Sequence, residues 1–152
     1  MADADIVVVG QGELSLVADL YNQVFRPGKD EEFFKRRLAG RYQWLILIAH
    51  VEKRPVGFSI SMELKPDTWF GWLVGVLPDY RRAKIATQLL KAELEWAREH
   101  HYALSRYECF NRHKPMLHLA LTLGYDVVGI RWDPGHNDNI IIFEKDLTTE
   151  PN

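Results

Sequence analysis

Three basic residues, Arg81, Arg82 and Lys84, stand in a short segment that begins with a proline and follows an apolar stretch. Pro78-Asp79 is a helix-start signal, and apolar residues recur at helical spacing from Ile85 onward, which predicts one long helix from Pro78 to about His100 with these cations in its first two turns. The helix dipole disfavours cations at a helix N-terminus by roughly 0.3–1 kcal/mol each. Free backbone N–H groups, the dipole and flanking cations together bind phosphate groups. The segment therefore predicts an anion site, and a solvated basic patch is the alternative interpretation.

Three further side chains have the chemistry of acid–base catalysts. Glu63 lies near the end of a predicted strand, out of phase with its apolar residues, and is the first candidate for a general base. Glu108 is the second candidate, although it alternates with Arg106 on a strand and an ion pair is its structural interpretation. Histidine titrates near neutral pH, so His113 is a candidate proton donor to a leaving group. A solvated or structural position is the alternative for each of them.

The composition is that of a globular protein that binds neither nucleic acid nor membrane. Of the 152 residues, 47% are hydrophobic and 26% are charged, which is enough to bury a core and predicts one domain over residues 1–152. The net charge of -2 comes without a block of like charge, so nucleic-acid binding lacks electrostatic support. The apolar runs are too short to span a bilayer.

The cysteine and histidine content narrows the chemistry further. The single cysteine, Cys109, excludes an internal disulfide framework and has no recognisable base for covalent catalysis. The histidines have no carboxylates at metal-ligand spacing, so we expect no metal. The first residues lack the basic start and apolar stretch of a secretory signal, and we expect a cytoplasmic protein.

Apolar periodicity predicts the element order β-α-α-β-β-β-α-β-α-β-β, a mixed α/β (α+β) domain. An antiparallel meander leads into a β-α-β crossover, and Gly71 and Gly75 indicate a bulge or a close approach to the third meander strand. The predicted strands cover 6–9, 44–51, 56–64, 68–76, 104–110, 125–132 and 139–147, and the predicted helices cover 13–25, 30–40, 78–100 and 115–123.

The segment Val76-x-Pro78-x-x-Arg81-x-x-Lys84-x-Ala86 resembles motif A of the GNAT N-acetyltransferases, which reads Arg/Gln-x-x-Gly-x-Gly/Ala after a strand ending in Val-x-Pro. The segment 115–125 is similar to motif B, and 56–58 is similar to the entry into the family's third strand. The resemblance covers nearly the whole chain. It implies the GNAT fold, a single mixed and mostly antiparallel sheet of about seven strands with about four helices.

The resemblance also implies acetyl-CoA as co-substrate. In the family, backbone amides at the helix start cradle the CoA pyrophosphate, and the preceding strand pairs with the pantetheine arm and donates a backbone N–H to the oxyanion. The residues implied in cofactor binding are Val74, Val76, Arg81, Arg82, Ala83, Lys84, Ile85, Ala86, Thr87 and Asn111.

Three positions depart from the family pattern. Lys84 stands where motif A has its central glycine, Ala120 where motif B often has a tyrosine acid, and His113 where an asparagine is frequent. The resemblance predicts an acetyl-CoA-dependent N-acetyltransferase that transfers acetyl to a primary amine by direct attack in a ternary complex. The alternative is a non-catalytic CoA-binding or protein-interaction module on the same fold.

The resemblance does not identify the acceptor, which is a small-molecule or protein amine. The predicted acceptor groove lies beside the first two helices. Dimers are common for this fold, so a homodimer is compatible with the resemblance. The residues considered for the groove are Tyr21, Phe25, Arg26, Glu31 and Glu32 from the helices, and Trp69, Phe70, Trp72 and Trp132 from the strands.

Overall fold

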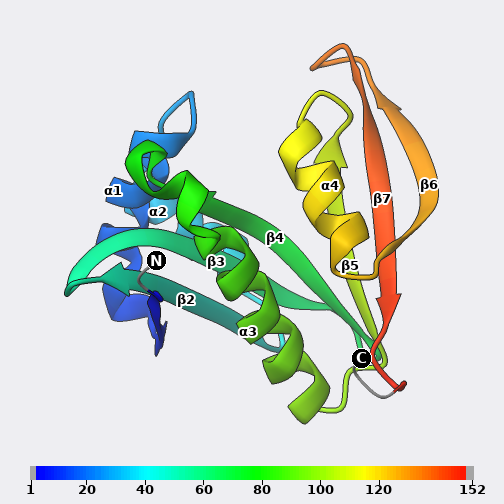
Figure 1. The fold of residues 1–152 in the computed structure, drawn as a ribbon, viewed down its shortest axis with the longest axis horizontal. Coiled ribbons are helices and arrows are strands. Elements are labelled where there is room, and N and C mark those ends of the chain that lie inside the picture. Colours follow the sequence, from blue (N-terminus) through cyan, green and yellow to red (C-terminus); the bar gives the residue numbers. More distant parts are fainter. Residues whose placement is uncertain (1–2, 150–152) are drawn as a thin grey trace.

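The computed structural model describes residues 3–149, except the side chains of Arg82 and Ala83. Seven strands form one sheet in the order β1-β2-β3-β4-β5-β7-β6, and four helices cover it (Figure 1). The predicted element order and fold class are confirmed. The elements are β1 (Asp5–Val9), η1 (Gln11–Glu13), α1 (Leu14–Val24), α2 (Glu31–Leu38), β2 (Trp44–Val51), β3 (Arg54–Lys65), β4 (Thr68–Val76), η2 (Pro78–Ala83), α3 (Ile85–Glu99), β5 (Leu104–Phe110), α4 (Lys114–Thr122), β6 (Asp126–Asp133) and β7 (Asp138–Asp146).

The sheet is antiparallel except at its centre. Strands β1 to β4 form a meander, and β5, β7 and β6 form a second antiparallel group. The two groups meet where β4 runs parallel to β5, and α3 makes the crossover between these strands. This pairing extends only from Thr68 to Gly71 on β4 and from Leu104 to Tyr107 on β5. Beyond it the two strands diverge, and Figure 1 shows α4, β6 and β7 on one side of the opening.

The meander is buried on both faces because helices lie on each. One hydrophobic cluster lies under α3 and α4, and the other lies under α1 and α2. On β3, Phe58 and Ile60 belong to the α1–α2 cluster, whereas Ser59 and Ser61 point the other way and are also fully buried. The apolar and polar residues that alternate on β3 therefore face two different buried cores, and neither set faces solvent.

The two glycines of β4 lie where the sequence predicts a bulge or a close approach. The register with β3 shifts so that Gly71 and Leu73 face consecutive β3 residues and Trp72 has no partner. A Cβ atom on Gly71 would lie 2.0 Å from the ring of Tyr107, and one on Gly75 would lie 2.8 Å from the ring of Phe58. Each glycine thus leaves room for an aromatic ring against the strand.

The long helix predicted from Pro78 to about His100 is wrong at its beginning. Residues Pro78–Ala83 form the 3-10 turn η2, and α3 begins only at Ile85. Lys84 separates the two with a left-handed backbone (φ 59°, ψ 30°), which cannot continue a right-handed helix. Arg81 and Arg82 therefore precede α3 and do not lie in its first turns.

The second helix begins as predicted. The Asp30 side chain accepts a 3.0 Å hydrogen bond from the Phe33 N–H and caps α2, while Gly40 follows the helix with φ 78°. Within residues 3–149, no helix has the length and apolar content needed to cross a membrane.

Candidate functional site

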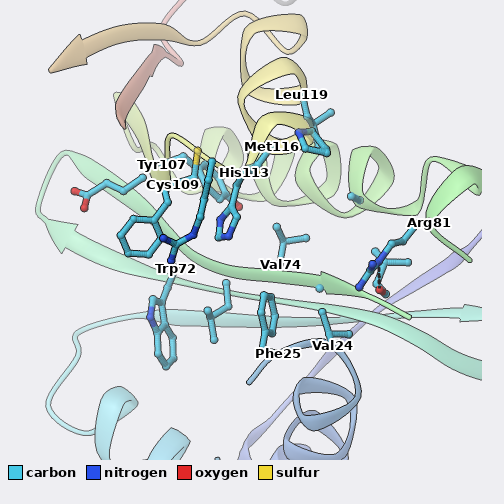
Figure 2. A pocket seen from close by; sticks show the side chains of 18 of the residues that line it. Val24, Phe25, Trp72, Val74, Arg81, Tyr107, Cys109, His113, Met116 and Leu119 are labelled. Carbon is cyan, nitrogen blue, oxygen red and sulfur yellow. Dashed lines mark hydrogen bonds between the residues drawn. The ribbon is translucent and has the colours of Figure 1, made fainter. Parts of the chain in front are cut away.

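A cavity of about 640 Å³ opens where β4 and β5 separate (Figure 2). Its walls come from the second half of β4, the end of β5, the end of α1 and the start of α4. The volume lies within the range of small-molecule sites, and the walls are mostly apolar. Among the labelled side chains of Figure 2, Phe25 and Trp72 approach from the α1–α2 side, and Met116 and Leu119 approach from α4.

The strand edge inside this cavity is open. From Trp72 to Val76, β4 is paired with β3 on one side and is not paired with β5 on the other. Backbone N–H and C=O groups at such an edge need partners, and an extended ligand can supply them as an added strand. Val74 and Val76, both predicted to bind the cofactor, line the cavity along this edge.

Arg81 lies at the end of the open edge. Its Nε donates a 3.1 Å hydrogen bond to the carbonyl oxygen of Val76, and its side chain lines the cavity. Ala86, in the first turn of α3, also lines the cavity. Among the side chains that the structure describes, none caps the N-terminus of α3, and its first turn holds no acidic residue, so an anion can take the place of a cap.

Three of the other predicted cofactor residues, Ile85, Thr87 and Asn111, do not line the cavity. Ile85 is fully buried in the core under α3, and Thr87 is half-buried. Asn111 lies after β5, where its side-chain oxygen accepts a 3.2 Å hydrogen bond from Lys114 Nζ. The side chains of Arg82 and Ala83 fall outside the part of the chain that the structure describes.

The backbone conformation of Lys84 explains why motif A has a glycine at this position. Its left-handed φ of 59° is a conformation that glycine adopts freely and that costs other L-residues roughly 1–2 kcal/mol. The lysine keeps the backbone path that glycine would give, and its side chain is exposed. The substitution therefore preserves the turn into α3 and adds an ammonium group beside it.

Glu63, the first candidate base, lies away from the cavity. It is at the far end of β3, opposite Trp69 near the start of β4, whereas the cavity begins at Trp72. Its carboxylate accepts a 3.0 Å hydrogen bond from the hydroxyl of Tyr102. The structure thus gives Glu63 a hydrogen-bond partner and places it outside the cavity lining.

Glu108, the second candidate, lines the cavity. Its two carboxylate oxygens bond separately, one to Arg106 at 3.1 Å and the other to Arg131 on β6 at 3.2 Å. Arg106 also lies 3.7 Å from Glu144 on β7. The predicted ion pair with Arg106 is present, and it holds the carboxylate at the cavity wall.

His113 and Cys109 also line the cavity, but their protonation limits what they can do. Burial and the nearby Arg112 lower the pKa of His113, partly offset by Asp138, so the ring is neutral at neutral pH. A neutral imidazole accepts a proton more readily than it donates one, which weakens the predicted role as donor. Burial raises the pKa of the Cys109 thiol to about 11, so it is not a thiolate nucleophile at neutral pH.

Comparison with known families decides the classification. Residues 14–125, well over half of the chain, match the acetyltransferase (GNAT) family. The chain belongs to the GNAT acetyltransferase family. The predicted family and enzyme class are thereby confirmed, with the acceptor unknown. No curated protein matches the sequence significantly.

Solved structures share this GNAT fold at low sequence identity. The ribosomal-protein-S18-alanine N-acetyltransferase of Escherichia coli superposes with a TM-score of 0.84 at 16% identity, over 98% of this chain and 97% of its own. Ard1 of Thermoplasma volcanium has a TM-score of 0.83 at 13% identity, over 97% and 100%. The protein yncA of Salmonella typhimurium, solved with its cofactor acetyl-CoA, has a TM-score of 0.77 at 13% identity, over 99% and 98%.

Two of the residues considered for the acceptor groove of this GNAT protein line the cavity. Phe25 directly follows α1, and Trp72 lies at the β4 bulge with the guanidinium of Arg37 4.4 Å from the centre of its ring. Trp69 is fully buried under α3, and Trp132 is exposed on β6. The remaining residues considered for the groove do not line the cavity: Tyr21, Arg26, Glu31, Glu32 and Phe70.

Sequence analysis missed one carboxyl group near the site. Glu93 on α3 is fully buried, and the hydroxyl of Tyr107 on the cavity wall lies 2.9 and 3.0 Å from its two oxygens. Burial raises the pKa of Glu93 to about 8. The signal was present in the sequence, because Glu93 interrupts the apolar stripe of the helix between Leu89 and Ala97. Among residues 3–149, no cluster of side chains could hold a metal ion.

Proposed function

We propose that this GNAT protein is an acetyl-CoA-dependent N-acetyltransferase, in which a primary amine attacks the acetyl group directly in a ternary complex. The observation that carries the proposal is the open edge of β4 within a mostly apolar cavity. Arg81 and the uncapped start of α3 lie at one end of this edge, and Glu108 is on the facing strand near its other end.

The residues present fit acetyl-CoA. The backbone of Val74 and Val76 offers hydrogen bonds to an extended pantetheine arm, and the apolar walls suit its alkyl groups. Arg81, Lys84 and the first N–H groups of α3 offer a cationic site for the pyrophosphate. Bound acetyl-CoA supplies the acetyl group as a thioester. The acetyl-CoA complex of yncA supports this assignment through the shared fold.

Glu108 is the base that the geometry favours, in place of Glu63. Arg106 and Arg131 hold this carboxylate at the cavity wall, where it can accept a proton from an ammonium group directly or through water. The unpaired edge of β4 supports a role for its backbone N–H groups in stabilising the carbonyl oxygen as negative charge develops on it. His113, neutral at neutral pH, suits the role of a second proton acceptor.

The acceptor is a primary amine on a small molecule or a protein. The Escherichia coli structure is that of an enzyme named for the alanine of ribosomal protein S18. Peptides with a free N-terminal alanine therefore belong in an acceptor screen, beside amino acids and small amines.

The first test is thermal unfolding with acetyl-CoA, and with desulfo-CoA and ATP as controls. A ligand at about a hundredfold excess over its dissociation constant stabilises the folded state by about 2.7 kcal/mol, a shift of roughly 5–10 °C for a chain of this length. We expect a shift with both CoA compounds and a smaller one with ATP. Absence of a shift at millimolar acetyl-CoA would contradict the cofactor assignment and favour the protein-interaction module. Binding without turnover of any amine would favour the non-catalytic CoA-binding module.

A further inference from the structure

Tyr107 occupies the point where β4 and β5 part. It is the last β5 residue in register with β4, opposite Gly71, and its ring lies against that glycine. The side chain is buried, and it lines the cavity. The ring therefore packs against β4 at the last paired position, directly before the open edge begins.

A carboxyl group from another element holds this ring. Glu93 lies about two turns into α3, and both of its oxygens are within 3.0 Å of the Tyr107 hydroxyl. Ser61 on β3 points toward the same carboxyl without completing a hydrogen bond. The bond thus ties the helix that begins the phosphate site to the strand that carries Glu108.

Apolar residues could pack at the two positions of this pair. The surrounding helix stripe is apolar, and a leucine at position 93 with a phenylalanine at 107 would fill similar space without burying a carboxyl group. A buried hydrogen-bonded pair fixes one arrangement of its partners more narrowly than apolar contacts do. A site that must hold a thioester within hydrogen-bond reach of the β4 backbone gains from such a constraint.

We propose that Glu93 and Tyr107 are positioning residues for acyl transfer, which fix the separation of β4 and β5 and thereby the placement of Glu108. This inference rests on the proposed function. Glu108 is the next residue after Tyr107 and points to the opposite face of β5. A displaced Tyr107 ring moves the backbone of both residues, so the base shifts relative to the open strand edge.

The arrangement is sensitive to pH. The titratable groups that face the Glu93 carboxyl are Tyr107 on β5 and Tyr125 before β6, and neither carries a positive charge. Because burial raises the pKa of Glu93 to about 8, the carboxyl is neutral at neutral pH and ionises above that value. An uncompensated charge in the core then loosens the contact between α3 and β5.

The test compares four variants with the wild-type protein. Glu93→Leu and Tyr107→Phe remove the bond, Glu93→Gln keeps a neutral partner for Tyr107, and Glu95→Gln on the exposed face of α3 is the matched control. The measurements are kcat and KM for acetyl-CoA with a fixed amine from pH 6.5 to 9.5, and acetyl-CoA affinity by direct titration. Thermal unfolding at each pH establishes which variants are folded.

We expect Glu93→Leu and Tyr107→Phe to lower kcat about 10- to 100-fold with a smaller effect on acetyl-CoA affinity, because displaced groups react slowly even when bound. Glu93→Gln should retain more activity than Glu93→Leu. The ratio of kcat for Glu93→Gln to kcat for the wild type should rise above pH 8, because only the wild type ionises in the core. This ratio removes the titration of the acceptor amine from the comparison.

Two results would overturn the inference while leaving the proposed function in place. One is wild-type kcat in Glu93→Leu and Tyr107→Phe, and the other is a flat ratio of Glu93→Gln to wild type across the pH range. If Tyr107→Phe does not fold, the ratio alone decides. A wild-type protein that neither binds nor consumes acetyl-CoA would overturn the proposed function itself, and the inference with it.

Discussion

The Nε atom of Arg81 donates a 3.1 Å hydrogen bond to the carbonyl oxygen of Val76, the last residue of β4. This bond holds the guanidinium where the open strand edge meets the turn into α3. A guanidinium has five donors, so the group can hold the strand and still face a bound anion. One side chain thereby links the two parts of the predicted CoA site.

Reversal of charge at this position should weaken acetyl-CoA binding. Charge-assisted hydrogen bonds contribute about 1.5–3 kcal/mol each, so Arg81→Glu should raise the acetyl-CoA dissociation constant at least tenfold. Arg81→Glu combined with Arg82→Glu should raise it further. Lys91→Glu, exposed further along α3, is the control and should bind normally. Equal affinity of Arg81→Glu and Lys91→Glu in a titration would remove Arg81 from the site.

Lys84 should cost stability that a glycine would restore. Because its φ is 59°, Lys84→Gly should raise the free energy of unfolding by about 1 kcal/mol, whereas Lys84→Ala should not. Denaturant unfolding without ligand measures both. A Lys84→Gly protein no more stable than Lys84→Ala would show that the left-handed turn carries no strain.

The break between η2 and α3 could not be predicted from the sequence. Apolar spacing locates the helix from Ile85 to Glu99, because its buried stripe repeats at the helical period. Pro78-Asp79 is a helix-start signal, so the sequence predicts a helix that already begins there, and no residue type marks the break at Lys84. Glycine or asparagine usually signals a left-handed backbone conformation, whereas here a lysine adopts that conformation.

The two candidate bases show the same limit for the site. Both Glu63 and Glu108 were found as carboxylates on strands, and only the sheet register separates them. Glu63 faces the paired start of β4, and Glu108 faces the part where β5 has left β4. Strand order and the point of divergence depend on tertiary packing, which includes the contact of Tyr107 with Gly71. Spacing along the chain carries no such information.

That contact makes Gly71 intolerant of a side chain. A Cβ atom there would lie 2.0 Å from the Tyr107 ring, so Gly71→Ala should destabilise the protein by about 1–3 kcal/mol, as overpacking does elsewhere. Gly12→Ala is the control, since no atom lies within 4 Å of its added Cβ. The double variant Gly71→Ala, Tyr107→Leu should lose less stability than the two single effects together. Additive losses in denaturant unfolding would argue against the contact.

Ionisation of Glu93 should make stability fall as pH rises. The pKa of Glu93 is raised from 4.5 to about 8 on folding, so the wild type loses stability relative to Glu93→Gln from about pH 4.5 to pH 8. Below pH 4.5 the Glu93 carboxyl is protonated in both the folded and the unfolded protein, so this loss of stability is absent. One pKa unit corresponds to about 1.4 kcal/mol, so the accumulated loss amounts to several kcal/mol. Unfolding free energies of both proteins at pH 5 and pH 8 measure it; a constant difference would contradict the shift.

Acetyl transfer by the wild type and by Glu108→Gln tests the central claim most directly. The proteins are incubated with acetyl-CoA and a panel of amines, including peptides with N-terminal alanine, and released CoA and acetylated product are measured together. The account predicts an acceptor that gains one acetyl group per CoA released. It also predicts a kcat about 10²- to 10⁴-fold lower in Glu108→Gln at unchanged acetyl-CoA affinity, the usual contribution of a general base. Tight acetyl-CoA binding with no amine acetylated, or full turnover by Glu108→Gln, would contradict it.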